Sequence, residues 1–303
     1  MLQTFDERNR QLLVNIGGRL SPREQAGVSP FDSVVQGGDA VWEGLRLFDG
    51  RVFRLREHLA RLRRSAQALA FAQIPSDEEI VGEIRRTLEA NGMRDEVHIR
   101  LTLTRGTKLT SGMDPRLNTS GPTLIVLAEY KAPVYDLAGI RLVTASVRRP
   151  RADVLDPKIH HTNLLPSILA KVEANVAGAD DALMLDDQGF VAETNATNVF
   201  LVFGDVKGGT VATPTTRACP EGITRGAVIE LCASASLPLV AGDWSLAQVY
   251  SADEVFVTGT MGGLAPVVSV DGRSIGSGAP GPVTARLADA YAHLTVSTGT
   301  KVV

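Results

Sequence analysis

Apolar residues in this chain come in short runs, and the length of those runs limits what the chain can fold into. Two of the longest, residues 123–128 and 183–185, have the length of a β-strand, whereas a membrane-spanning helix needs roughly 20 apolar residues. With 303 residues, 44% of them hydrophobic, there is enough apolar material for one large or two medium cores. The sequence therefore predicts a globular protein built from many short elements, with no membrane as its partner.

The spacing of apolar residues predicts a mixture of helices and strands. In the first part of the chain we expect helices at 55–71 and 76–91 and strands at 41–48, 97–104 and 123–129. In the second part we expect helices at 166–177, from 224 onward and at 282–295, strands at 140–147, 182–185, 198–203 and 254–258, and a hairpin at 268–275. No Gly-x-Gly-x-x-Gly string opens a βαβ series, which disfavours a Rossmann fold. The predicted class is α+β.

A domain boundary is predicted where this periodicity lapses. Segment 131–137 has little pattern and contains a proline, which is typical of a connection between domains. We therefore expect an N-terminal α+β domain at 1–130, a linker at 131–137 and a C-terminal α+β domain at 138–303.

Charge and cysteine content exclude several classes of partner. The net charge is −3 and the isoelectric point is near 6.0, so no basic field attracts nucleic acid. Cys219 and Cys232 lack metal-ligand spacing and are read as free thiols, with no metal site expected. The first 14 residues mix acidic and basic side chains instead of leading into an apolar run, so we expect a cytoplasmic location.

Two segments are suited to binding an anion. Residues 220–226 run directly into an amphipathic stretch, which places the amides of Ile223 and Thr224 at a helix N-terminus, where phosphate is favoured. Residues 257–263 combine glycines with Thr260 at a strand end. An N-cap threonine and an ordinary tight turn would produce the same patterns, so each segment alone is ambiguous.

For Arg61 and Glu193 the sequence does not decide between a binding role and an ordinary structural role. Arg61 lies in a helix so basic that a single inward-pointing arginine cannot be distinguished from its solvated neighbours. Glu193 ends a short strand and precedes Asn198 in a polar stretch between apolar flanks. A buried carboxylate there would suit a protonated ring nitrogen, but its own loop could satisfy it as well.

The joint order of these motifs resembles the fold-type IV pyridoxal-phosphate enzymes, which include branched-chain and D-amino-acid aminotransferases and aminodeoxychorismate lyases. The matching strings are Val41-Trp-Glu-Gly-Leu-Arg46, His58-Leu-Ala-Arg61, Asn163-Leu-Leu, Glu193 with Asn198-Val-Phe, Gly222-Ile-Thr-Arg225, Gly259-Thr260 and Pro280-Gly-Pro-Val-Thr284. The resemblance spans nearly the whole chain. It implies the two-domain fold of that family, pyridoxal 5'-phosphate or pyridoxamine 5'-phosphate as cofactor, and a homodimer.

The resemblance also implies roles for particular residues. Arg61, Ile223, Thr224 and Thr260 would hold the cofactor phosphate, Asn198 would lie beside the cofactor, and Glu193 would pair with the pyridine nitrogen. Most cofactor contacts would then come from the C-terminal domain. A pyridine nitrogen kept protonated makes the ring an electron sink for a carbanion at the substrate α-carbon.

The family's Schiff-base lysine has no counterpart in a gapless alignment. In many members it stands three residues before the asparagine that corresponds to Asn163, and here that position is His160, within Asp156-Pro-Lys-Ile-His160. Lys158 could serve after a local shift of register, His160 could be an acid–base group in a natural lysine-free member, or the histidine could be an engineered replacement. We favour the gapless alignment, because the flanking strings fit without a slip.

Substrate-side residues depart from the family pattern as well. Trp42 stands where a Phe or Tyr is usual, and His98 and Arg100 lie where branched-chain enzymes place a tyrosine and an arginine. The Arg-x-His carboxylate trap of D-amino-acid enzymes is missing after Arg105. The favoured function is amino-group transfer between a small amino acid or amine and a 2-oxo acid. The alternatives are an aminodeoxychorismate-type lyase and a cofactor-binding protein without turnover.

Overall fold

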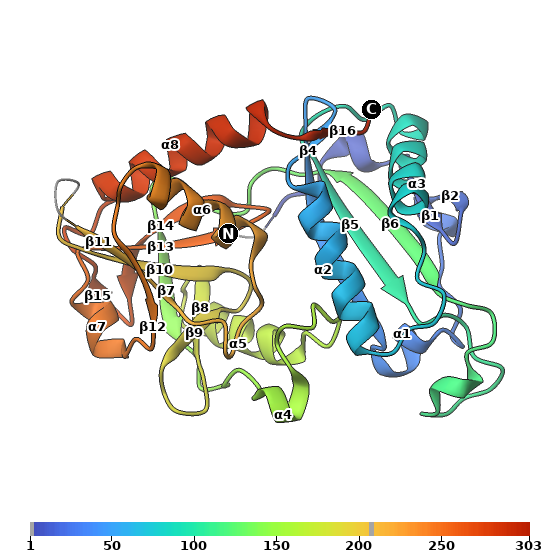
Figure 1. Ribbon diagram of the computed structural model, residues 1–303, viewed down its shortest axis with the longest axis horizontal. Coiled ribbons are helices and arrows are strands. Elements are labelled where there is room, and N and C mark those ends of the chain that lie inside the picture. Colours follow the sequence, from blue (N-terminus) through green and yellow to red (C-terminus); the bar gives the residue numbers. More distant parts are fainter. Residues whose placement is uncertain (1–2, 206–208) are drawn as a thin grey trace. The chain divides into compact units, whose positions relative to one another are not determined.

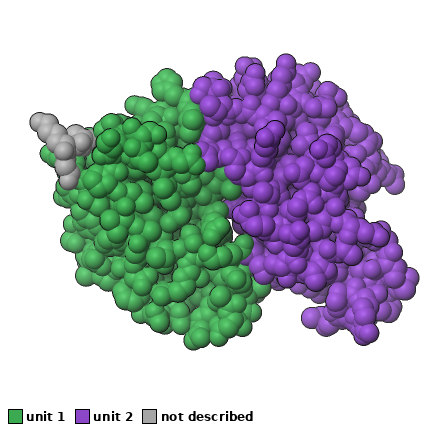
Figure 2. Space-filling view, viewed as in Figure 1, with its two compact units in different colours: residues 1, 133–158, 164–294 green, residues 2–132, 159–163, 295–303 purple. Residues whose placement is uncertain are grey.

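The chain divides into two compact units in the computed structural model, which describes residues 3–205 and 209–303 (Figure 2). The N-terminal unit, purple in Figure 2, contains the chain up to Ala132 together with 159–163 and 295–303. The C-terminal unit, in green, contains 133–158 and 164–294. None of the helices in the described ranges combines the length and the apolar character that crossing a membrane requires.

The two units differ from the predicted domains, 1–130 and 138–303, in two short segments. The division after Ala132 falls inside the predicted linker, 131–137. Residues 159–163 and 295–303 nevertheless belong to the N-terminal unit, because each pairs with a strand of its sheet. Such long-range strand pairing leaves no local signal in a sequence.

The N-terminal unit is a sheet covered by helices (Figure 1). Among the described strands, seven form its sheet in the order β16-β4-β3-β5-β6-β1-β2. The strands are β1 (Leu13–Ile16), β2 (Arg19–Pro22), β3 (Ala40–Phe48), β4 (Arg51–Val52), β5 (Val97–Thr104), β6 (Thr123–Tyr130) and β16 (Thr300–Lys301). The helices are α1 (Ser33–Gly37), α2 (Leu55–Ala68), α3 (Asp77–Ala90) and the short 3-10 turns η1 (Glu7–Asn9), η2 (Arg23–Gln25) and η3 (Pro115–Leu117).

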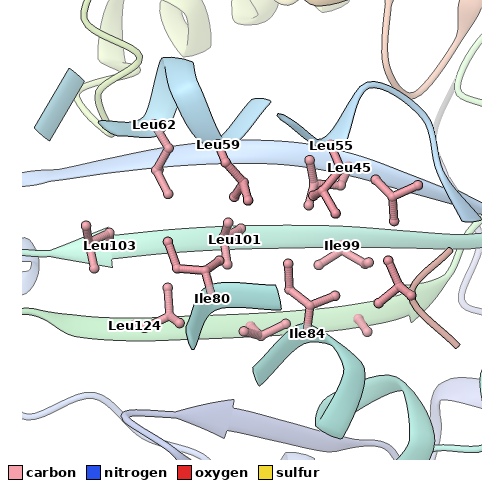
Figure 3. Packing of buried hydrophobic residues seen from close by; sticks show 14 of the residues in the cluster. Leu45, Leu55, Leu59, Leu62, Ile80, Ile84, Ile99, Leu101, Leu103 and Leu124 are labelled. Atoms are coloured by element: carbon pink, nitrogen blue, oxygen red, sulfur yellow. The ribbon is translucent and has the colours of Figure 1, made fainter. Parts of the chain in front are cut away.

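The core of this unit lies between the sheet and helices α2 and α3. Figure 3 shows Leu55, Leu59 and Leu62 of α2 and Ile80 and Ile84 of α3 pointing at the strands. These spacings of three and four residues place them on one face of each helix. A capping box begins α3, since the Ser76 hydroxyl accepts the amide of Glu79 and the Glu79 carboxylate accepts the amide of Ser76.

The C-terminal unit is built around a second sheet. Of the described strands, nine belong to it, in the order β12-β11-β10-β13-β14-β7-β8-β9, with β15 paired to β14. The strands are β7 (Ile140–Thr144), β8 (Asp181–Leu185), β9 (Val191–Thr194), β10 (Asn198–Phe203), β11 (Thr210–Pro214), β12 (Leu239–Gly242), β13 (Glu254–Gly259), β14 (Gly263–Val270) and β15 (Arg273–Ser274). The helices are α4 (Ala152–Leu155), α5 (Leu165–Val176), α6 (Ile223–Ser234), α7 (Leu246–Tyr250) and α8 (Pro282–Ser297), of which residues 295–297 belong to the N-terminal unit.

Strand register brings Asn198 and the predicted anion-binding segment 257–263 to one end of the sheet. The first residue of β10, Asn198, pairs with Thr258 near the end of β13. Gly259 then pairs with Gly263 across the turn that contains Thr260. Segments far apart in the sequence therefore meet where these strands begin and end.

Candidate active site

The segment around His160 lies along the edge of β3. The Trp42 amide donates to the His160 carbonyl at 2.9 Å, and the Thr162 amide donates to the Ala40 carbonyl at 3.0 Å. The Trp42 indole N–H adds a bond of 3.0 Å to the His161 carbonyl. These bonds place the His160 side chain beside the two residues that begin the Trp-Glu-Gly string.

Glu43 is the centre of a buried charge cluster in the N-terminal unit. Its carboxylate accepts Arg61 Nε at 2.8 Å and Nη2 at 2.7 Å, and it accepts His58 Nδ1 at 2.7 Å. His58 and Arg61 are three residues apart on α2, on the face that also carries Leu55, Leu59 and Leu62. Burial opposes ionisation of Glu43, but the Arg61 charge and the hydrogen bonds outweigh it and lower its pKa to about 2. The carboxylate is therefore ionised at neutral pH.

His160 packs into this cluster as a neutral ring. Its imidazole stacks on the Trp42 indole with centroids 4.3 Å apart, and its Nδ1 contacts the Trp42 carbonyl oxygen and lies 3.6 Å from Glu43 Oε1. Burial, with the Arg61 charge, lowers the pKa of His160 to about 3, against the opposite influence of Glu43. At neutral pH the ring is therefore uncharged, with one protonated and one unprotonated nitrogen.

The predicted substrate-side residues lie on two neighbouring strands, Trp42 on β3 and His98 and Arg100 on β5. The Arg100 guanidinium stacks over the Trp42 ring at 3.5 Å, a cation–π contact, and Arg100 pairs with Gly44 across the β3–β5 ladder. His98 pairs with Arg46 on the same ladder. Burial, with the charges of Lys131, Arg100 and Arg46, lowers the pKa of His98 to about 3. This part of the sheet is thus cationic through its arginines, while its histidine is neutral.

Glu193 is held by an arginine that the sequence did not single out. Glu193 Oε1 and Arg149 Nη2 are 2.9 Å apart, and both side chains are almost completely buried. Arg149 also donates to the Ser167 hydroxyl at 3.1 Å and the Ala218 carbonyl at 3.3 Å. The sequence suggested two partners for Glu193, a ring nitrogen or its own loop. The structure adds a third, the distant Arg149.

The start of helix α6 lies close to Asn198. Its N-cap is Gly222, which carries no side-chain cap in the described structure, and a Cβ built there would lie 1.9 Å from Asn198 Oδ1. Only glycine therefore fits at this close approach to Asn198. Nearby in register, the buried hydroxyl of Thr258 finds no hydrogen-bond partner among the described residues, as expected of a group that awaits a ligand.

Lys158 has an ion-pair partner of its own. Its ammonium donates to the Thr216 hydroxyl at 3.1 Å and to Glu221 at 3.0 Å, and its side chain is half exposed. Lys158 belongs to the C-terminal unit, whereas His160 belongs to the N-terminal unit. The role of Lys158 as the Schiff-base lysine stays an untested prediction.

Of the predicted site residues, the N-terminal unit brings together Trp42, Arg61, Arg100 and His160, with His98 along the same strand as Arg100. The C-terminal unit brings Asn198, Ile223 and Thr224 to one end of its sheet. Sequence reasoning missed Glu43, His58 and Arg149. Glu43 carried the one usable signal, an acidic residue inside a strand whose other residues, except Arg46, are apolar or glycine.

Comparison with known proteins assigns the chain to a family of enzymes. The chain belongs to the class IV aminotransferase family. The family described as Amino-transferase class IV matches residues 40–270. The chain is 57% identical over 292 residues to the branched-chain-amino-acid aminotransferase-like protein 2 of Arabidopsis thaliana, a match that covers 96% of this chain but spans only about half (52%) of that relative. It is 39% identical to a putative branched-chain-amino-acid aminotransferase of Methanocaldococcus jannaschii, over 95% of this chain and 98% of that protein.

A solved structure agrees with this assignment. The branched-chain amino acid aminotransferase of the organism abbreviated T.th., complexed with N-(5'-phosphopyridoxyl)-L-glutamate, matches with a TM-score of 0.86 and 33% identity, over 95% of each chain. The predicted family and the predicted fold-type IV α+β fold are therefore confirmed.

Proposed function

We propose that this chain is an aminotransferase that uses pyridoxal or pyridoxamine 5'-phosphate without a lysine–cofactor bond. It would transfer an amino group between a small amino acid or amine and a 2-oxo acid. The observation that carries the proposal is the α6 N-terminus, where the first amides of the helix, Asn198 and the unsatisfied Thr258 hydroxyl gather at one end of the sheet. The phosphopyridoxyl compound bound by the T.th. aminotransferase supports the choice of cofactor.

The residues of this chain fit a phosphate ester and a protonated ring nitrogen. The Ile223 and Thr224 amides and Thr260 are neutral donors suited to phosphate, and Arg61 is proposed to add a charged one. Glu193 would accept the ring N–H, and its buried pair with Arg149 favours the ionised carboxylate that this bond requires. When bound, the cofactor supplies an electron sink for negative charge at the substrate α-carbon.

Substrate handling falls to the N-terminal unit in this proposal. Arg100, cationic and stacked on Trp42, would meet a substrate carboxylate, and neutral His98 would line the same surface. His160 can take up and return a proton, but an imidazole cannot form the imine through which a lysine carries the cofactor. The amine of pyridoxamine phosphate, or the free aldehyde, would have to bind without that link.

A single-turnover experiment tests this function. The purified protein is loaded with pyridoxamine phosphate and mixed with pyruvate, 2-oxoglutarate or a branched-chain 2-oxo acid, and amino acid formation is followed by mass spectrometry. We expect one of these acids to gain the amino group, and Glu193→Gln to slow that conversion. Elimination products without amino transfer would favour the lyase alternative, and bound cofactor with no product at all would favour a binding protein.

We also propose that the protein forms a homodimer, on the evidence of helix α5. Its buried face carries Ala170 and Ala174, but its other face exposes five large apolar side chains, each at least 46% accessible: Leu165, Ile168, Leu169, Val172 and Val176. Their spacing places them on one stripe of the helix, and contiguous apolar patches of this kind mark interaction sites. A second copy presenting the same stripe would cover it symmetrically.

Light scattering after size exclusion tests the dimer. The unmodified protein is expected at twice the chain mass, and Val172→Glu is expected to shift it toward the monomer at micromolar concentration, because the introduced carboxylate would be buried unpaired. Val240→Glu is the matched control, since Val240 is an exposed valine on β12. A monomeric unmodified protein, or a Val172→Glu protein that dimerises as tightly as the control, would contradict the proposal.

A further inference from the structure

The ring nitrogens of three neighbouring histidines face different kinds of atom. His160 Nδ1 faces the Trp42 carbonyl oxygen and lies 3.6 Å from Glu43 Oε1. His58 Nδ1 lies 2.7 Å from the other Glu43 oxygen. In contrast, His161 Nδ1 lies 3.1 Å from the backbone N–H of Asn163. Carbonyl and ionised carboxylate oxygens only accept hydrogen bonds, whereas a backbone N–H only donates.

We infer that Glu43 and the Trp42 carbonyl hold His160 as the Nδ1–H tautomer, so that Nε2 is the atom that accepts a proton, with Glu43 acting as a positioning residue. The Trp42 carbonyl oxygen and the Glu43 carboxylate, which both face Nδ1, together favour the hydrogen on that nitrogen, which leaves the lone pair on Nε2. By the same argument His161 must be the opposite tautomer, with its hydrogen on Nε2. The tautomer itself rests only on the contacts around the ring, whereas its use in catalysis rests on the proposed function.

The charged groups around His160 explain why a carboxylate is needed there. Arg61, on α2, donates to the Glu43 carboxylate, and its charge disfavours a second positive charge on His160. Arg100, on β5, stacks on the Trp42 indole, as His160 does. Glu43, on β3, and the hydrogen bond to the Trp42 carbonyl favour protonation of the ring, whereas Arg61 and His58, both on α2, oppose it. If a proton passes from the substrate carbon to Nε2, the resulting imidazolium keeps its Nδ1–H on the Trp42 carbonyl and faces the Glu43 anion. The carboxylate thereby offsets the charge that the ring acquires.

Nitrogen NMR of the cofactor-free protein tests this assignment. Protonated and unprotonated imidazole nitrogens resonate at well-separated shifts, so a sample with ¹⁵N-labelled histidine reports each tautomer directly. At neutral pH we expect His160 to show a protonated Nδ1 and an unprotonated Nε2, and His161 to show the reverse as an internal control. The signals are assigned by their loss in His160→Gln and His161→Gln. A His160 ring protonated at Nε2, or at both nitrogens, would overturn the inference.

Glu43→Gln tests the positioning role. The neutral amide removes the anion that favours Nδ1–H, so the proportion of that tautomer should fall several-fold and the pKa of His160 should decrease further. Glu129→Gln is the control, because Glu129 lies on β6 opposite His98. A folded Glu43→Gln protein with the unmodified tautomer ratio and pKa would reject Glu43 as the positioning residue. Because these spectra need no cofactor, they stand or fall independently of the proposed function, and the unmodified protein alone decides the tautomer if the variant does not fold.

Discussion

Replacing His160 with lysine is expected to create a covalent bond between the protein and pyridoxal phosphate. The position lies on the β3 edge beside Glu43 and Trp42, and it is where the family resemblance places the Schiff-base lysine. Borohydride treatment should then fix the cofactor to the chain, with the adduct at position 160 in a peptide mass map. We expect the transamination rate to rise on the order of 10²-fold, the lower range for a positioned acid–base group.

The matched control is His161→Lys, one residue farther along the same segment. His161 faces the Asn163 amide, whereas it is the His160 ring that stacks on Trp42, so no adduct is expected there. Lys158→Met in the His160→Lys background should leave the adduct in place. A borohydride-stable adduct on Lys158 of the unmodified protein would contradict the proposal of a lysine-free site and restore a lysine mechanism in a shifted register.

Replacing Arg61 with methionine is expected to lower the free energy of unfolding of the cofactor-free protein by about 3–5 kcal/mol, the range measured when one partner of a buried ion pair is removed. Glu43 is fully buried, and Arg61 supplies two of its short hydrogen bonds. Without the guanidinium, the carboxylate must remain ionised with less compensation or take up a proton. Urea unfolding without cofactor measures the change.

Arg63→Met is the control on the same helix. Arg63 pairs with Asp77 at 2.6 Å, but both side chains are about one-third exposed or more, so a loss of about 0–1 kcal/mol is expected. Cofactor titration of the Arg61→Met protein then measures a separate quantity, since the proposed phosphate contact would add about 1.5–3 kcal/mol of binding. An Arg61→Met protein as stable as Arg63→Met would contradict the structural role, and unchanged cofactor affinity would contradict the phosphate role.

Sequence reasoning predicted the longer helices and many of the strands, but not β1, β2, β11 or β12. The capping box of α3 and the apolar faces of α2 and α3 are local patterns that depend on residues three and four apart. The family was identified from the order of several short strings, none of which was specific alone. Arg61 was singled out only by that order, because its basic neighbours hid the direction of its side chain.

The partners of the buried charges were decided by the tertiary structure alone. Desolvation dictates that Glu43 and Glu193 must have partners, but it does not name them: Arg61 reaches Glu43 because α2 packs on β3, and Arg149 reaches Glu193 from a loop before α4. The tertiary structure alone also places residues 159–163 in the N-terminal unit, because they pair with β3, a strand more than a hundred residues earlier in the chain. The sequence by itself determined the family and many local elements, and it predicts a histidine at the lysine position, because these are properties of neighbouring residues or of their order. The environment that makes this histidine neutral and orients its ring exists only once distant strands and helices are packed together.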